Sequence, residues 1–395
     1  MRIRSKSSWT YLMLILTCFF IPQVQAGWMD DLKNATGAIN DAVTTTDNIK
    51  KDVENTADRV KKQISGTANT DDEVVGNETA ESPIKVNTDN FVRAETAAQI
   101  DRFVKMAGGV NKWTHFRLPT PLDKQTVIRM NRDTLYSAAL VDISKGATLT
   151  LPNPGKRYMS MMVLNEDQYV NKVFHKGGTY KLTMKEYDSP YVLLLGRTLV
   201  NPADPKDIKT ANALQDQMKI KAVSSKPYSH PNYDQESYKA TYKALLDLSA
   251  GIPDSQRMFG KKDEVSEVRH LLGAAFGWGG LPTYEAVYTT KNQSRPTGEF
   301  QLTVKDVPVD GFWSISIYNK DGYFEKNKFD SYSINSVTAK PNDNGSVTVN
   351  FGTNKNGKKN FLYVMDGWNY VVRLYQPYRV IQEGKWAFPE PRPVK

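Results

Sequence analysis

The stretch from residue 127 to residue 137 holds the densest group of side chains able to do chemistry, between segments that alternate like β-strands. The candidate ligand-binding residues in it are Arg129, Asn131, Arg132, Asp133 and Tyr136. In a structural interpretation, Asp133 bonds to the neighbouring arginines, and Asn131 and Thr134 cap backbone groups, which fixes a loop. In a functional interpretation, an arginine binds an anionic group that Asp133 and Tyr136 orient. Acid–base catalysis would need a second carboxylate or a histidine nearby, so the catalytic residues stay unknown.

Other residue types with chemical potential are sparse. The histidines at positions 115, 175, 230 and 270 are scattered and show no metal-ligand spacing, so we expect no metal site and no cofactor. His175 precedes Lys176-Gly177-Gly178 and is expected at an exposed loop. A Gly-x-Ser-x-Gly elbow is absent from the sequence, which argues against the common esterase pattern.

The first 26 residues have the pattern of a secretory signal peptide. Basic residues at positions 2, 4 and 6 precede an apolar run from residue 11 to residue 21, and Val24-Gln25-Ala26 suits cleavage after Ala26. An uncleaved N-terminal anchor is the alternative. The only cysteine, Cys18, lies in the apolar run, so the mature chain would have no disulfide. We therefore expect a periplasmic or secreted protein, and the lack of disulfides suits a bacterial periplasm.

The charge of the chain bears on its partners. Cleavage removes three basic residues and no acidic one, which lowers the formal net charge from +9 to +6. The remaining Lys and Arg are mixed with acidic residues along the chain, unlike the basic stripe of a nucleic-acid-binding protein, so no nucleic acid is expected. A mildly basic exported protein can bind cell-wall glycan, anionic lipid or another envelope protein, and ordinary solvated surface charge is the alternative.

The chain divides into segments of different composition. We predict a signal peptide at 1–26, an amphipathic helical arm at 27–65, a disordered linker at 66–90, a first β-rich domain at 91–200, a helical insert at 201–285 and a second β-rich domain at 286–395. Ala and Thr fill half of the apolar seam of the arm. The arm therefore suits self-association or docking on a membrane or partner, or it is a marginal, partly disordered segment.

Strand patterns dominate the two β-rich domains, and most helix patterns lie in the insert between them. Strands are predicted at 127–130, 135–143, 147–151, 158–164, 179–184 and 191–200, and again from residue 286 onward before a Pro-rich tail. Helices are predicted at 94–107, 207–221, 235–250 and 264–276.

An internal repeat connects the two strand-rich regions. Residues 158–169 align without a gap to residues 312–323, and in both copies a strand enters an Asn-x-Asp turn and continues at a Tyr. Tyr136-Ser137 and Tyr288-Thr289 precede the two copies, and later strands beginning at Tyr191 and Tyr370 follow them. The ordered series predicts an α+β, β-rich fold: two related antiparallel β-sandwich-like halves with a helical insert between them.

These same residues resemble a pair of bacterial families. Residues 109–111, 131–137 and 157–160 look like the domain of unknown function 1254, with Asn131-Arg132-Asp133-Thr134-Leu135-Tyr136-Ser137 as its specific string. Residues 312–318, 332–334 and 371–375 look like its usual companion, the domain of unknown function 1214. The resemblance covers roughly residues 91 to 393 and implies a two-domain, β-rich, often exported protein, but no reaction, cofactor or catalytic residue. Asn360-Phe361-Leu362-Tyr363 departs from the companion's frequent Asn-Trp-Leu-Pro.

Two functions remain open from the sequence. The duplicated halves and the amphipathic arm favour a non-catalytic exported protein that binds a ligand or associates with the cell envelope. The alternative is a periplasmic hydrolase with its polar site around residues 131–136, because the polar side chains there exceed what one turn needs.

Overall fold

The structure is a computed structural model that describes residues 82–125, 128–249, 251–252 and 254–394, and in addition leaves the side chains of residues 290–294 undescribed. The residues from Pro83 onward belong to one compact unit. The predicted signal peptide, helical arm and nearly all of the linker lie outside the described residues.

The first half contains two antiparallel sheets with apolar side chains between them. The larger sheet has the order β1-β2-β7-β4-β5 and the smaller has the order β6-β3-β8. The strands are β1 (Thr114–His115), β2 (Thr134–Asp142), β3 (Ala147–Leu151), β4 (Met159–Asn165), β5 (Val170–Phe174), β6 (Gly178–Leu182), β7 (Tyr191–Leu199) and β8 (Lys219–Ala222). Alternate residues of β2, β4 and β7 pack against β3 and β6, which makes this half a β-sandwich.

The second half repeats this arrangement. Its sheets have the orders β12-β11-β15-β9 and β14-β13-β10-β16. The strands are β9 (Ala286–Arg295), β10 (Phe300–Val304), β11 (Trp313–Tyr318), β12 (Ser333–Asn335), β13 (Val347–Gly352), β14 (Phe361–Tyr363), β15 (Trp368–Tyr375) and β16 (Arg392–Pro393). The core between the two sheets includes Trp313, Phe351 and Trp368. The pair β13–β14 is parallel, an exception to the predicted antiparallel pattern.

The strand orders show that the two halves share one topology. Read in the same direction, β2-β7-β4-β5 corresponds to β9-β15-β11-β12, and β6-β3-β8 corresponds to β13-β10-β16. Corresponding strands also follow one another along the chain in the same sequence, with β1 and β14 as additions. The predicted repeat therefore extends to whole sandwiches.

The turns after β4 and β11 confirm the repeat at the level of hydrogen bonds. The side-chain oxygen of Asn165 accepts from the backbone N–H groups of Asp167 and Tyr169, and that of Asn319 accepts from Asp321 and Tyr323. Both turns place their fourth residue at positive φ, Gln168 at 62° and Gly322 at 89°.

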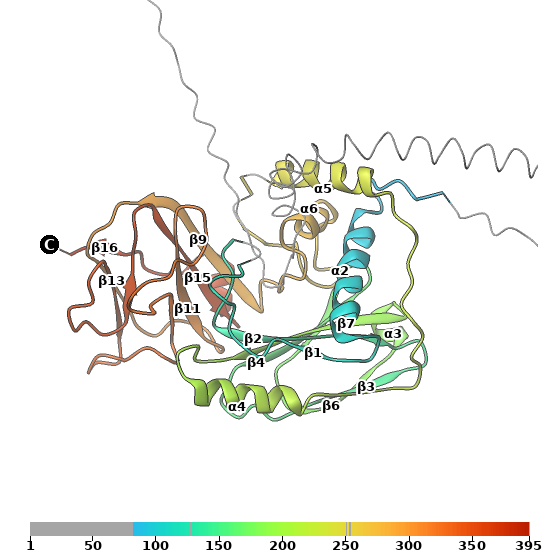
Figure 1. Cartoon of the computed structure of the whole chain (residues 1–395), viewed down its shortest axis with the longest axis horizontal. Coiled ribbons are helices and arrows are strands. Elements are labelled where there is room, and N and C mark those ends of the chain that lie inside the picture. Colours follow the sequence, from blue (N-terminus) through green and yellow to red (C-terminus); the bar gives the residue numbers. More distant parts are fainter. Residues whose placement is uncertain (1–81, 126–127, 250, 253, 395) are drawn as a thin grey trace, which may run out of the picture. The chain divides into compact units, whose positions relative to one another are not determined.

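Helices cover the outer face of the first half's larger sheet (Figure 1). The helices of the described residues are α2 (Phe91–Ala107), α3 (Met184–Tyr187), α4 (Pro205–Asp216), α5 (Gln235–Ser249), α6 (Glu267–Gly277) and α7 (Arg379–Gln382). Among them, α2 lies on this face with α5 and α6 packed against it (Figure 1). Ile100 and Phe103 of α2 pack on the sheet, while Phe91, Ala94 and Ala97 pack on α5 and α6. Between the halves, α4 caps its N-terminus with Asp204, whose side chain accepts a bond from Lys206 N.

Two expectations about local structure were wrong. Ile128 and Arg129 form a turn instead of the strand predicted at 127–130, because Arg129 adopts φ +56°. The helix predicted at 207–221 ends at Asp216, and β8 follows because alternate residues of 219–222 face the sandwich. The Pro-rich tail contributes β16, which pairs with β10. The strands β1 and β5 were not predicted at all.

The described end of the predicted linker contacts the rest of the unit. Ile84 forms a parallel bridge with Tyr233, and the N–H of Ile84 donates to Asn232 O at 2.8 Å. Val86 is buried among residues of α2 and α5. Residues 84–90 are therefore attached by both backbone and apolar contacts.

Candidate functional site

The polar stretch from Arg129 to Asp133 lies at the junction of the two halves. Arg129 donates to Asn369 Oδ1 at 3.0 Å, and Asn131 donates from Nδ2 to the Tyr375 hydroxyl at 2.9 Å. Arg132 donates to the Thr120 carbonyl, and its guanidinium lies 5.5 Å from the centroid of the Tyr332 ring. Burial lowers the pKa of both arginines. These residues thus bind the second half more than they bind one another.

Asp133 is fully buried against the sheet of the second half. Its Oδ1 accepts from Asn335 Nδ2 at 3.3 Å, and its backbone N–H donates to Asn131 Oδ1 at 2.8 Å. Burial raises the pKa of Asp133, while the charge of Arg373 and hydrogen bonds from Ser314 and Asn335 act in the opposite direction. The carboxyl group therefore lies over three adjacent strands, β12, β11 and β15.

Arg373 is the main partner of this stretch, and it is buried too. It donates to Ser316 Oγ at 2.9 Å, to the Tyr318 hydroxyl at 2.8 Å and to the carbonyl of Arg129 at 2.8 Å. The Tyr318 hydroxyl in turn donates to Met130 O at 2.7 Å. Arg373 thus fixes the turn before β2 on the second half, whereas the structural interpretation expects the neighbouring arginines to fix it.

Tyr136, the fifth candidate residue, points elsewhere. It lies on the outer face of the first half's larger sheet and packs in an apolar cluster that also contains residues of α2 and of the segment after α6. Tyr136 pairs across the strands with Arg197, and Arg197 pairs with Ser160. The structure therefore separates Tyr136 from the other four candidates and places it beside a buried arginine that the sequence analysis missed.

The polar residues beside Tyr136 form a row across four strands. His175 directly follows β5, and because Phe174 pairs with Met161, His175 continues the register opposite Ser160. The row is then His175, Ser160, Arg197 and Tyr136, which we call the first-half row. Met162 and Leu164 on β4 and Leu195 on β7 share its face.

The second half has an equivalent row, and it is the one that holds Asp133. Ser314 pairs with both Asn335 and Arg373, and Arg373 pairs with Tyr288. We call Asn335, Ser314, Arg373 and Tyr288 the second-half row. The strand orders match these positions one for one with the first-half row, so each half carries a buried arginine and a serine at the same places.

His175 and Glu285 form the contact at the outer end of the first-half row. His175 Nε2 lies 2.7 Å from Glu285 Oε2, and its Nδ1 lies 3.0 Å from the carbonyl of Met159. Both ring nitrogens face oxygen acceptors, which leaves neither nitrogen oriented toward a nucleophile. The side chains are 22% and 11% exposed, so the row reaches solvent at this end. His175, which the sequence predicts at an exposed loop, is half-buried.

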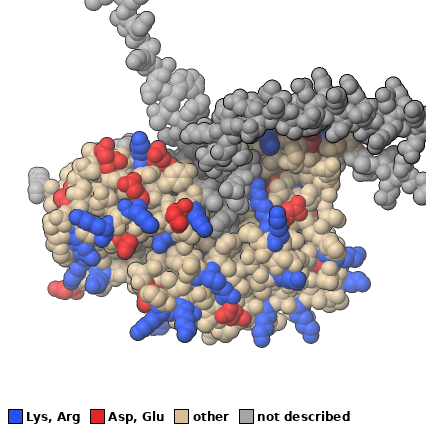
Figure 2. Space-filling view, viewed as in Figure 1, with Lys and Arg blue, Asp and Glu red and all other residues tan. Residues whose placement is uncertain are grey.

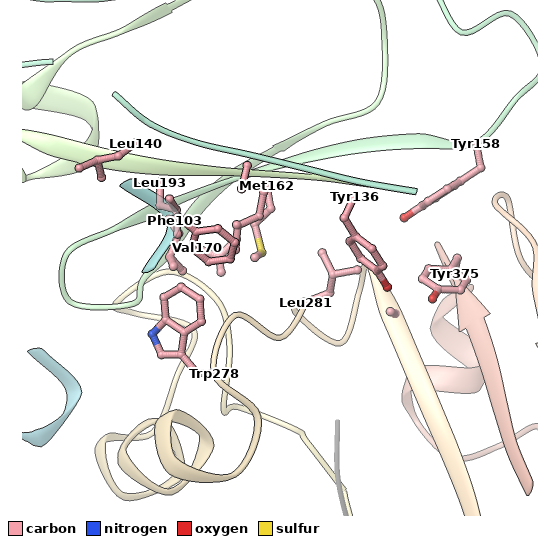
Figure 3. Packing of buried hydrophobic residues seen from close by; sticks show 14 of the residues in the cluster. Phe103, Tyr136, Leu140, Tyr158, Met162, Val170, Leu193, Trp278, Leu281 and Tyr375 are labelled. Atoms are coloured by element: carbon pink, nitrogen blue, oxygen red, sulfur yellow. The ribbon is translucent and has the colours of Figure 1, made fainter. Parts of the chain in front are cut away.

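The wall around the first-half row is aromatic and apolar. Phe312 stacks on Tyr375 with centroids 4.3 Å apart, and Tyr158 meets both rings at 5.1 and 5.3 Å. Figure 3 shows Tyr136, Tyr158 and Tyr375 gathered at one end of this cluster and Trp278 at the other. Polar groups in such surroundings interact strongly with whatever they contact, because the local dielectric constant is low.

Arg197 and Arg373 were not among the predicted site residues, although their sequence context could have indicated them. Each is a single arginine inside an otherwise apolar strand, and such a residue is buried only with specific partners. The predicted alignment set Tyr191 against Tyr370. The observed registers instead match Arg197 with Arg373, three residues away from that alignment.

Other kinds of site are not seen in the described part of the chain. Within it, no group of three or more His, Cys, Asp or Glu side chains is arranged to hold a metal ion. No helix there has both the length and the apolar character needed to cross a membrane. On the face shown in Figure 2, basic and acidic side chains are interspersed.

Comparisons with known proteins found matches to two families and to solved structures. Residues 110–222 match the family described as protein of unknown function DUF1254, and residues 283–379 match DUF1214. The solved structure of the VPA0106 protein from Vibrio parahaemolyticus is similar, with a TM-score of 0.61 and 19% identity over 78% of this chain and 98% of that chain. An uncharacterized protein from Burkholderia cenocepacia gives a TM-score of 0.43 and 15% identity over 78% of this chain and 87% of that one. No curated protein matches.

Proposed function

The chain joins a DUF1254 domain to a DUF1214 domain, and we propose that it is an exported, non-catalytic protein that binds a small ligand with an apolar body. One observation supports this most directly. The Ser160 hydroxyl is fully buried on the aromatic face of the first half, and in the described part of the chain it has no hydrogen-bond partner. Buried polar groups almost always have a partner, so an orphaned hydroxyl beside aromatic rings suggests a ligand.

The N-terminal sequence supports the proposal that the protein is exported. The basic, apolar and small-residue segments at the N-terminus have the order of a secretory signal. Cell-wall glycan, lipid or another envelope protein remain proposed partners for the segment before the compact unit. The ligand proposed here is a separate small molecule that enters the compact unit itself.

A hydrolase centred on residues 131–136 is the alternative, and the geometry favours it less. Asp133 is fully buried, and its carboxyl group contacts Asn335 and lies near Arg373. A substrate would have to displace the contacts that join the two halves to reach it. A hydrolase screen comparing the wild-type protein with Asp133→Asn tests this alternative, and equal turnover in both removes it.

Ligand binding can be tested with apolar probes of simple structure. Decanoate and decan-1-ol, titrated below their aggregation concentrations, should quench or shift the emission of Trp278, which lies in the wall of the row. They should also raise the thermal unfolding midpoint in a concentration-dependent manner. Trp278→Phe is the matched control and should remove the optical signal while keeping the thermal shift. Absence of both responses for both probes would contradict the proposal.

A further inference from the structure

The outer face of the first half's smaller sheet is lined by lysine and threonine. Leu149, Leu182 and Ile220 point into the sandwich from β3, β6 and β8, so the alternate residues of these strands point outward. We call the outward residues the lysine face. The strand register arranges them in two rows, with Lys181, Thr148 and Lys221 in one row and Thr179, Thr150 and Lys219 in the next.

Positive charge is concentrated on this sheet. Its strands and adjoining turns, residues 144–158, 176–188 and 217–226, contain nine Lys and Arg and two Asp and Glu, a formal net charge of +7. The chain without its predicted signal peptide carries +6, so its other residues add no net positive charge. Arg157 pairs with Asp207, and the eight lysines form no ion pair in the described part of the chain. In Figure 2, basic side chains gather along the lower edge, where β3 and β6 lie in Figure 1.

The corresponding sheet of the second half is nearly neutral. Its strands β13, β10 and β16 take the places of β6, β3 and β8. On its outward face Gln301 pairs with Asn350, and Thr303 pairs with Thr348. Arg392, which pairs with Gln301, is the charged exception. The fold therefore does not need lysine at these positions, and like charges placed together cost stability through repulsion. An anionic partner would remove this repulsion.

Two exposed apolar side chains lie at one end of the lysine face. Val223 directly follows β8, is 73% exposed and donates its N–H to Gly146 O at 3.1 Å. Met184 begins α3 shortly after β6 and is 44% exposed. Because β6 and β8 both run antiparallel to β3, both side chains lie at the end of the sheet where β3 begins. Exposed lysines adjoin them, Lys185 next to Met184 and Lys145 next to Gly146.

We propose that the lysine face docks the protein on an anionic phospholipid membrane. The lysines contact lipid phosphate groups, and Val223 and Met184 enter the boundary between head groups and hydrocarbon. These apolar side chains favour a membrane over a soluble polyanion, which offers no hydrocarbon to receive them. The secretory signal predicted at the N-terminus would bring the protein to such a membrane. This surface is separate from the apolar face proposed for the small ligand, and neither proposal depends on the other.

A fluorescent label on a single cysteine tests where the membrane contacts the protein. The chain without its predicted signal peptide has no cysteine, so Val223→Cys and the control Val337→Cys each supply one attachment site for an environment-sensitive dye. Val337 is 65% exposed and lies in the second half. Vesicles of equal parts of phosphatidylglycerol and phosphatidylcholine should shift the emission of the dye at residue 223 to the blue and leave that at residue 337 unchanged. Vesicles of phosphatidylcholine alone should shift neither.

The contribution of the lysines is measured in the labelled Val223→Cys protein. Lys181→Gln combined with Lys221→Gln should raise the lipid concentration for half of the shift about tenfold or more, because one lysine near an anionic surface strengthens binding about fivefold. The control, Lys305→Gln combined with Lys340→Gln, removes two exposed lysines of the second half and should change that concentration less than about twofold. All these side chains are exposed, so the thermal midpoints should stay near that of the wild type.

Three results would overturn the proposal. The first is no shift at residue 223, or equal shifts at residues 223 and 337, even if the chain sediments with vesicles through its N-terminal segment. The second is an equal loss of binding for the two lysine pairs, which would assign binding to the net charge of the protein and not to this face. The third is a shift with soluble polyphosphate as large as that with anionic vesicles, which would assign the face to a soluble polyanion.

Discussion

Asp133 and Glu285 hold the same position in the two halves, and each places its carboxylate on a side chain of the opposite half. Asp133 precedes β2 and accepts from Asn335, while Glu285 precedes β9 and lies 2.7 Å from His175. The carbonyls of both residues accept a backbone bond at 2.8 Å, Asp133 from Val200 and Glu285 from Gln376. The junction is therefore a reciprocal exchange of carboxylates between duplicated sandwiches.

The exchange predicts that Asp133 stabilises the fold strongly. Asp133→Ala leaves the buried guanidinium of Arg373 without its nearby carboxyl group, and removal of one partner from a buried charged pair costs about 3–5 kcal/mol. Urea unfolding at neutral pH measures this loss. The matched control is Asp321→Ala, at an exposed turn position, which should change the free energy of unfolding by no more than about 0.5 kcal/mol. Equal losses in both variants would contradict a special role for Asp133.

The sequence predicted the sandwiches well because their signals are local. The bounds of β3 agree with the prediction, and those of β2, β4 and β7 agree within one or two residues, since alternation and turn residues lie next to each other in the chain. The repeated Asn-x-Asp turn was equally visible.

The rows were not predicted because they are properties of register between distant strands. Nothing near Ser160 in the sequence indicates that it lies beside Arg197, and a shift of one residue would move both to the other face of the sheet. The polar stretch at 129–133 was visible, but its partners come from β11, β12 and β15, more than 180 residues away. Whether those candidates bind a ligand stays a prediction.

The turn after β11 contains Gly322, whose backbone conformation and close contact can be tested by substitution. Gly322 adopts φ +89°, and a Cβ atom there would lie 3.0 Å from the Cβ of Ile128. Gly322→Ala therefore adds both backbone strain and a contact with the segment before β2, and we expect a loss of about 2 kcal/mol in the free energy of unfolding. Gly345→Ala is the control, because φ there is +79° and nothing lies within 4 Å of the added Cβ atom. It should cost about 1 kcal/mol from strain alone. A smaller loss at Gly322 than at Gly345 would show that the contact with Ile128 is absent.

The lowered pKa of His115 predicts how the stability of the fold depends on pH. Burial, together with the charge of Arg117, lowers the pKa of His115 to about 4, whereas an unfolded histidine titrates near about 6.5. Between these values the unfolded chain binds more protons, so this contribution to stability is complete above about pH 6.5 and is lost as the pH falls toward 4. His115→Gln should flatten the decline in unfolding free energy between pH 6.5 and 4.5.

His230 is the control with the opposite sign. Burial lowers its pKa, but hydrogen bonds to Asp101 and to the Pro231 carbonyl raise it above its ordinary value overall. Its contribution is therefore complete below the unfolded pKa and is lost as the pH rises through the folded pKa. His230→Gln should destabilise the protein more at pH 5 than at pH 8. Identical pH profiles for both variants and the wild type would contradict both assignments.

The last prediction concerns the boundary between the N-terminal segment and the compact unit. The sequence of residues 27–65 offers a thin apolar stripe and the next residues are polar, which predicts that residues 27–90 serve attachment or self-association and are not needed for folding. The contacts of Ile84 and Val86 with the compact unit move the end of this dispensable segment to residue 81. Deleting residues 27–81 should leave the thermal midpoint nearly unchanged and reduce either sedimentation with membranes or the oligomer mass. Deleting residues 27–90 should lower the midpoint, because it also removes the Ile84 bridge to Tyr233 and the buried side chain of Val86. If the shorter deletion fails to fold, the segment before residue 82 belongs to the core.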